Sequence, residues 1–169
     1  NIPICMTLIE EGVFSCCNLG QIIIPSSVTN IGNSAFQLNQ KVTLITIPNS
    51  VVSIGNNAFA DNKSLTEIEI PSSVTSIGNC AFGYCDSLAR IVIPSSVNSI
   101  GKEAFTFCIS LTQVTVLSHS AQIGEGAFDN CTSLTQVTIH SPVEKIGKGA
   151  FEECKSLTEI TVPSSYSSS

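Results

Sequence analysis

The sequence predicts an α/β repeat solenoid of about seven coils, and three observations support this prediction. Apolar and small residues recur at a spacing of 23 along nearly the whole chain of 169 residues. Each repeat contains one segment in which apolar and polar residues alternate, as they do along a half-buried strand. A unit of this length cannot bury its own apolar face, so neighbouring units must stack and bury it together.

The repeat is defined by an Ile-Gly pair and an Ala-Phe pair that keep their register six times. The phenylalanines are Phe36, Phe59, Phe82, Phe105, Phe128 and Phe151. The clearest copy runs from Ile77 to Ser99, and an earlier copy over residues 9–30 is degenerate. Six repetitions of the same residue types are not expected by chance, so the spacing indicates a repeated structural unit.

Each element of the repeat has a physical reason. Alternating apolar residues predict a strand over residues 65–70, which Pro71 ends because proline cannot donate to a strand ladder. A second, shorter extended piece is expected over residues 74–77. Gly78 is expected to turn the chain through a positive φ, and one or two helical turns are expected over residues 79–85.

The combined pattern L-x-x-I-x-I and I-G-x-x-A-F-x-x-C resembles the BspA-like subclass of leucine-rich repeats, from Ile2 to Pro163. The resemblance implies a curved solenoid of leucine-rich-repeat type, with parallel strands on one face and short helical turns on the other. The chain departs from the pattern at Leu117 and His140, where proline is expected, and at Ser120, where valine is expected. Local irregularity is therefore expected there.

Members of this family are mostly surface or secreted proteins of microbes that take part in adhesion and protein binding. The resemblance therefore implies a protein or a cell-surface glycan as partner, and an extracellular or cell-surface location, with a cytoplasmic location left open. The solenoid is expected over residues 1–163, followed by a Ser-rich tail over residues 164–169. The strand ends Ile2-Pro3 and Val162-Pro163 share one phase, and neither carries a polar cap, which indicates a segment of a longer array.

Composition and motifs argue against several function classes. Charged residues make up 12% of the chain and the net charge is −6, with no basic stripe for a nucleic acid. No apolar run approaches the roughly 20 residues that membrane insertion needs. No nucleophile, general base, phosphate-binding loop or metal-ligand set converges. The sequence therefore predicts a protein that is not an enzyme, without catalytic, metal-binding or cofactor-binding residues and without a cofactor.

Four of the eight cysteines form one column of the repeat: Cys85, Cys108, Cys131 and Cys154. In two earlier units the same column holds Asn39 and Asn62, which share with cysteine a small polar group that can hydrogen-bond a neighbouring backbone. Buried free thiols in a structural ladder are favoured. A disulfide within the column is a weaker alternative, since adjacent coils place Cα atoms about 5 Å apart, and zinc is weaker still.

The histidines and the asparagines of glycosylation sequons are two further residue types that bear on function. His119 and His140 fall in turn regions away from the inward cysteines, so they are expected to be exposed. Asn62 and Asn130 begin glycosylation sequons. Asn62 belongs to the inward column, so Asn130 is the better acceptor if a eukaryote secretes the protein.

The outward positions of the strands are the most informative for function. Their charge cluster consists of Glu67, Glu69 and Arg90, and a cross-strand ion pair between Glu67 and Arg90 is expected. The face continues through Gln113, Gln136 and Glu159. We therefore expect a non-catalytic interaction or adhesion module that presents this face to a macromolecular partner. The alternative is a structural building block that associates head to tail in a longer array or filament.

Overall fold

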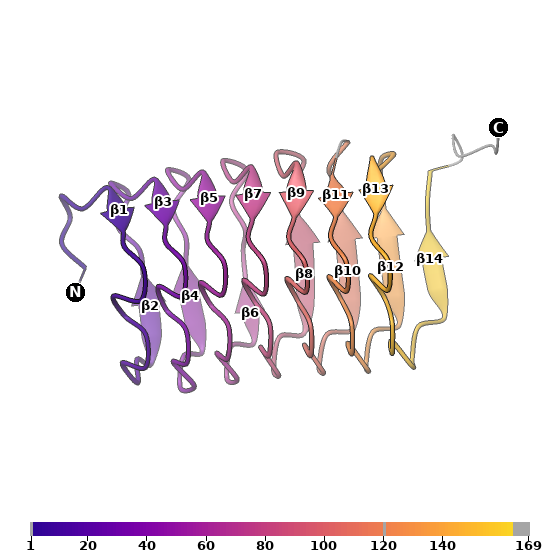
Figure 1. Cartoon of the computed structure of the whole chain (residues 1–169), viewed down its shortest axis with the longest axis horizontal. Helices are drawn as coiled ribbons and strands as arrows, with labels where there is room; N and C mark the ends of the chain where they lie inside the picture. Colours follow the sequence, from indigo (N-terminus) through magenta and orange to yellow (C-terminus); the bar gives the residue numbers. More distant parts are fainter. Residues whose placement is uncertain (1, 120, 164–169) are drawn as a thin grey trace.

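The structure is a computed structural model that describes residues 2–119 and 121–163. Over these residues the chain forms a row of about seven stacked turns, with the two termini at opposite ends (Figure 1). Each coil contributes strands to two faces of parallel sheet. Ser120 and the expected Ser-rich tail, residues 164–169, lie outside the described residues.

One face is a continuous parallel sheet of seven two-residue strands, which we call the short-strand sheet. In order, its strands are β1 (Leu8–Ile9), β3 (Asn30–Ile31), β5 (Ser53–Ile54), β7 (Ser76–Ile77), β9 (Ser99–Ile100), β11 (Gln122–Ile123) and β13 (Lys145–Ile146). The second residue of each strand is an isoleucine, and from β1 to β11 this isoleucine is buried. This sheet confirms the second extended piece that the repeat predicted.

The other face, which we call the strand face, is divided into two parallel sheets. The first contains β2 (Gln21–Ile23), β4 (Leu44–Thr46) and β6 (Glu67–Ile68). The second contains β8 (Arg90–Ile93), β10 (Gln113–Val116), β12 (Gln136–Ile139) and β14 (Glu159–Thr161). The division falls between β6 and β8, although neighbouring coils continue to stack there.

The core contains an uninterrupted spine of phenylalanine rings, as the repeat predicted. Phe36, Phe59, Phe82, Phe105 and Phe128 are completely buried. Successive rings from Phe14 to Phe151 lie nearly parallel, with centroids 5.1 to 5.5 Å apart. Stacked aromatic rings of this kind combine large apolar burial with a defined ring geometry, so the spine holds the coils in register.

The prediction of helical turns over residues 79–85 is wrong, because no helix is present among the described residues. Cys80 and Tyr84 adopt left-handed backbone conformations, with φ of 51° and 61°. The amide of Phe82 donates to the Ala104 carbonyl of the next coil at 2.8 Å, whereas Gly83 donates back to Cys80 at 3.0 Å. An α-helix would bond its amides to carbonyls four residues earlier in the same segment. Here the amides bond in part to the next coil and in part to their own turn, so the fold is a β-solenoid and not an α/β solenoid.

The role predicted for Gly78 also needs correction. Its φ is not positive, and a Cβ atom added to it would lie 2.5 Å from the Gly55 carbonyl carbon and 2.6 Å from the Asn56 amide nitrogen. The amide of Gly78 donates to Ile54 at 2.9 Å. Glycine is therefore required because backbones of adjacent coils approach closely, and not because of a left-handed turn.

The expected irregularity at the missing prolines is confirmed. The amide of Leu117 donates to Ile93 and that of His140 to Val116, both at 2.9 Å, which proline could not do. In the same coil, Ser118 Oγ donates to the Val97 carbonyl at 2.6 Å. The preceding coil makes the corresponding bond from Ser96, which lies one repeat position later, to the Val74 carbonyl at 2.7 Å. The extra bonds accompany the longer strands of the second sheet.

Candidate interaction surface on the strand face

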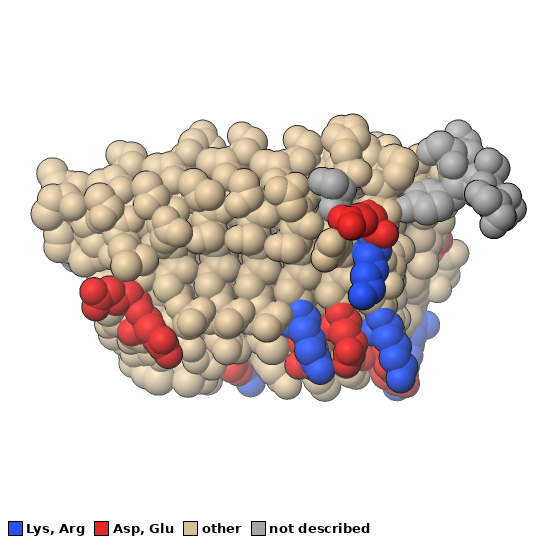
Figure 2. Space-filling view, turned by 45° about the horizontal axis from the view of Figure 1, so that its top comes forward, with Lys and Arg blue, Asp and Glu red and all other residues tan. Residues whose placement is uncertain are grey.

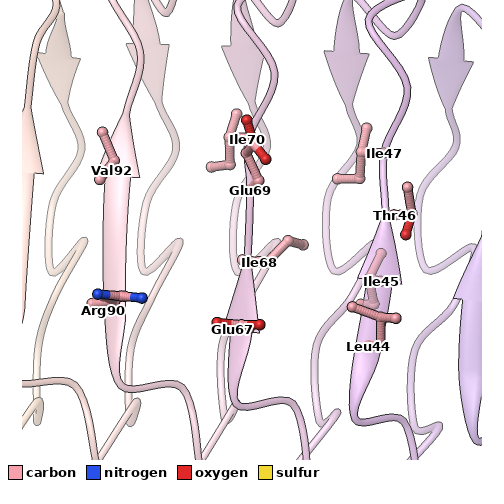
Figure 3. A pocket seen from close by; sticks show the side chains of 10 residues that line it. All are labelled: Leu44, Ile45, Thr46, Ile47, Glu67, Ile68, Glu69, Ile70, Arg90 and Val92. Carbon is pink, nitrogen blue, oxygen red and sulfur yellow. The ribbon is translucent and has the colours of Figure 1, made fainter.

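The division of the strand face leaves a shallow depression of about 580 Å³ between β4, β6 and β8 (Figure 3). The residues that line it are Leu44, Ile45, Thr46, Ile47, Glu67, Ile68, Glu69, Ile70, Arg90 and Val92. Its lining combines outward side chains of these strands with inward isoleucines of the same segments. It is a concave feature on an otherwise regular sheet, as small binding sites usually are.

The depression coincides with the short strand β6 and with a less buried isoleucine on it. Ile68 is half-buried, whereas its equivalents Ile45 and Ile91 are only 3% and 2% exposed. Strand β6 ends at Ile68, before Glu69. The phenylalanine spine and the short-strand sheet both continue past this coil, so the disruption is confined to the strand face.

The three predicted charged residues meet at this depression. Glu67 and Arg90 lie at the same level on neighbouring coils, and Glu69 lies further along the chain, just beyond the end of β6 (Figure 3). The expected ion pair between Glu67 and Arg90 is not formed: of the residues described, none pairs with Arg90 within 4.0 Å. Their charged groups are exposed and available to a partner.

Exposed apolar side chains surround this charge cluster. Leu44 and Val92, on either side of β6, are 42% and 48% exposed, and Ile23 on β2 is 60% exposed. An exposed apolar surface that also carries a few charged groups is typical of a protein-binding site. We call these residues, Ile23, Leu44, Glu67, Glu69, Arg90 and Val92, the strand-face patch.

The remaining predicted residues lie on the second sheet and interact with one another. Gln113 Nε2 donates to Gln136 Oε1 at 3.5 Å, and Gln136 Nε2 donates to Glu159 Oε2 at 3.2 Å. Their backbones are in register across β10, β12 and β14. These side chains form a ladder along the flat part of the sheet and do not reach the depression.

The inward column of cysteine and asparagine is confirmed as a hydrogen-bonded ladder. Cys108 Sγ donates to the Phe82 carbonyl of the preceding coil at 3.3 Å, and Asn39 Nδ2 donates to Phe14 at 2.8 Å. Burial raises the pKa of Cys85 to about 12 and that of the partly exposed Cys154 to about 11. These cysteines are therefore held as neutral thiols that serve the core.

The histidines and the sequon asparagines are placed as follows. His119 and His140 are exposed, as predicted. Asn62 is completely buried, whereas Asn130 is half-buried and donates to Asp129 Oδ2 at 2.8 Å. Over residues 2–119 and 121–163, no group of three or more His, Cys, Asp or Glu side chains is arranged to hold a metal ion.

Sequence reasoning missed an asparagine ladder that follows the Ile-Gly pairs. Asn33 Oδ1 accepts from the Asn56 amide at 2.9 Å, and Asn56 Oδ1 accepts from Asn79 at 2.7 Å. Lys102 ends this ladder and pairs with Glu125 at 3.2 Å. In Figure 2, acidic side chains lie at the N-terminal end, few charged side chains lie over the middle coils, and both charges gather toward the C-terminal coils. The 23-residue spacing of these asparagines was a usable signal.

Parallel strands, inward aromatic spine and backbone ladders define this chain as a leucine-rich-repeat solenoid. The model of the BspA type leucine-rich repeat region matches in six copies, over residues 7–132 and 53–169. The chain belongs to this family, whose members are generally protein-interaction or surface modules. No curated protein matches the sequence significantly.

Several solved structures resemble the chain. A leucine-rich repeat protein from Bacteroides ovatus is 35% identical over 93% of this chain, with a TM-score of 0.85. A T. pallidum leucine-rich repeat protein is 32% identical over 90% of this chain and 72% of its own, with a TM-score of 0.84. A leucine-rich cell surface protein from Faecalibacterium prausnitzii is 36% identical over 91% of this chain, with a TM-score of 0.78. The chain spans only 41% and 42% of the first and third of these proteins.

The F. prausnitzii protein is named a cell surface protein. Within the part of the chain that the structure describes, no helix has the length and hydropathy needed to cross a bilayer.

Proposed function

We propose that this chain is a non-catalytic interaction module of a surface or extracellular protein, and that the strand-face patch binds a partner protein. The observation that carries the proposal is the break between β6 and β8, which gathers Glu67, Glu69 and Arg90 without an ion pair among them. Leu44 and Val92 supply exposed apolar contacts beside them. Binding energy in protein interfaces is concentrated in such small clusters.

A charge swap tests this proposal without changing net charge. The variant Glu69→Lys with Arg90→Glu alters the patch, and Glu144→Lys with Lys145→Glu makes the same swap on the other side of the coils. The probe is a random-peptide display library selected on the unmodified protein. Selected peptides should bind the control as tightly as the unmodified protein and bind the patch variant at least tenfold more weakly, with identical melting curves.

Equal binding to the patch variant would move the interaction away from the strand face. A cell-surface glycan is the other partner that the family suggests. Screening the same three proteins on a glycan array distinguishes the two: patch-dependent glycan binding without peptide binding would assign the patch to a glycan.

The second candidate function is structural, with coils stacked end to end in a longer array. Such stacking would bury apolar side chains of the first and last described coils. Ile2, Ile4 and Phe14 line an open hollow of about 540 Å³ at the first coil, and Ile160 and Val162 are 49% and 45% exposed at the last. Glu159→Lys with Val162→Lys should then suppress association at high concentration, as size-exclusion chromatography would show. A concentration-independent monomer would contradict head-to-tail self-association.

A further inference from the structure

Two exposed aromatic residues lie side by side on neighbouring turns. Tyr84 and Phe107 are 42% and 37% exposed on the turns that lead from the short-strand sheet to the strand face. Both adopt left-handed conformations, with φ of 61° and 56°. The same repeat position is left-handed in the other coils too, with φ of 62° at Leu38, 60° at Asp61, 57° at Asn130 and 54° at Glu153. The conformation therefore belongs to the repeat, and what sets these two coils apart is an exposed aromatic ring at this position.

The two rings leave one aromatic face open. They lie 5.1 Å apart between centroids and are within 6° of parallel. Because they occupy equivalent positions of neighbouring coils, both ring planes face along the row of coils. Phe107 covers one face of Tyr84, and the other face is turned toward the coil that carries Asp61, whose side chain is shorter.

Asp61 is positioned to place a carboxylate beside this open face. Its amide donates to the Gly83 carbonyl at 2.9 Å, which fixes it next to the coil of Tyr84. Its carboxylate and that of Asp86 both raise the pKa of the Cys85 thiol, so both lie close to the residue that follows Tyr84. Lys63 pairs with Asp86 at 3.8 Å, whereas no described cation lies within 4.0 Å of the Asp61 carboxylate.

We propose that the open face of Tyr84 and the carboxylate of Asp61 form a binding site for an arginine side chain of a basic partner protein. The guanidinium lies flat on the ring and donates two N–H groups to the carboxylate. Arginine suits this arrangement better than lysine because its planar cation can stack and bind a carboxylate at once. This site lies on the turns and is independent of the strand-face patch.

Tyrosine ring resonances provide a direct test. The sequence has two tyrosines, so Tyr166→Phe leaves Tyr84 as the single tyrosine reporter. The probe is N-acetyl-arginine amide, with N-acetyl-citrulline amide as the neutral isostere and N-acetyl-lysine amide as the non-planar cation. The arginine probe should shift the Tyr84 ring signals saturably, the lysine probe should bind more weakly, and the citrulline probe should leave them unchanged.

Matched variants locate the binding. Asp61→Asn keeps a residue that tolerates the left-handed conformation, and should weaken binding of the arginine probe about two- to fivefold, as the loss of an exposed ion pair does. Tyr84→Asn, followed through the Asp61 amide, should weaken it by about the same factor. Glu67→Gln removes an equal charge on the strand face and should have no effect.

Three results would overturn the proposal. These are an absence of ring shifts with the arginine probe, equal shifts with citrulline or lysine, and unchanged affinity in both Asp61→Asn and Tyr84→Asn. The neutral probe separates charge recognition from non-specific stacking, and the fold of each variant is checked by the shifts of the other amides.

Discussion

The two halves of the strand face share one core and differ in their outer surface. The sheet of β8, β10, β12 and β14 is continuous, with strands of three or four residues and a glutamine ladder. The sheet of β2, β4 and β6 ends at a depression that contains unpaired charges. The phenylalanine rings stack equally on both sides, 5.3 Å for Phe59–Phe82 and 5.2 Å for Phe82–Phe105.

This comparison teaches that the inward columns set the stacking of coils and that the outward residues decide whether a sheet stays continuous. Leu117 and His140 add amide donors to the second sheet where Pro71 and Pro94 cannot. Glu67 on β6 and Glu69 just beyond its end place two carboxylates at the edge of the first. The patch is therefore a local departure on a uniform scaffold, and the following predictions test that separation.

The largest effect is expected in the common core. Phe59→Ala and Phe105→Ala, one in each half, should each destabilise the protein by about 3–5 kcal/mol, because both rings are fully buried. Urea unfolding measures the loss. Markedly different losses at the two positions would show that the core is not equivalent across the break.

Close backbone packing predicts the next effect. Gly78→Ala places a methyl group 2.5 Å from a backbone atom of Gly55, and should cost about 1–3 kcal/mol or more. Gly20→Ala is the matched control, since no atom lies within 4 Å of its added Cβ and its φ is not positive. Equal stabilities of the two variants in thermal melts would contradict the close-approach explanation.

The buried thiols predict a loss of stability in alkali. Burial raises the pKa of Cys85 from 9.0 to about 12. The unfolded chain therefore loses this proton first, and the stability associated with the thiol is complete below pH 9 and declines as the pH rises toward 12. At pH 10 the loss is on the order of 1 kcal/mol for this thiol.

Cys85→Asn isolates this contribution, because asparagine occupies the same column in earlier coils. Unfolding under reducing conditions at pH 8 and pH 10 should show a smaller decline for the variant than for the unmodified protein. Identical declines in stability for the two proteins would contradict the contribution of the Cys85 thiol. In a thiol-labelling assay at pH 8, the exposed Cys16 and Cys17 should react at once and Cys108 only after unfolding.

A smaller effect tests the continuous sheet. Leu117→Pro restores the proline of earlier coils and removes the 2.9 Å bond from the Leu117 amide to Ile93. The expected cost is about 0.5–1.5 kcal/mol, the usual contribution of one backbone hydrogen bond. Faster hydrogen exchange of the β10 amides should accompany it. Unchanged exchange would mean that this bond does not maintain the longer strands.

The smallest effect concerns the break itself. Glu69→Thr introduces the residue that the same column carries at Thr46 and Thr115, and should stabilise the strand face by about 0.2–1 kcal/mol. Slower hydrogen exchange of the Val92 amide would show that β6 and β8 now pair. Exchange as fast as in the unmodified protein would place the cause of the break elsewhere in the coil.

The sequence alone determined the repeat, the inward columns and the parallel stacking. Phe82 and Cys85 recur with their equivalents at one spacing, and a unit of 23 residues has only one way to bury them, which is against its neighbours. The outward positions of Glu67, Glu69 and Arg90 followed from alternation along the strand. These properties depend on local periodicity, which a single sequence contains.

Only the tertiary structure decided how the coils touch. Local patterns favoured helical turns at residues 79–85, but inter-coil hydrogen bonds and left-handed residues such as Tyr84 replaced them. Gly78 is required by a neighbouring backbone that is 23 residues away in sequence. The break between β6 and β8, and the ring face that Tyr84 turns toward Asp61, likewise depend on how one coil lies against the next. That relation is fixed by close packing between coils and not by any segment on its own.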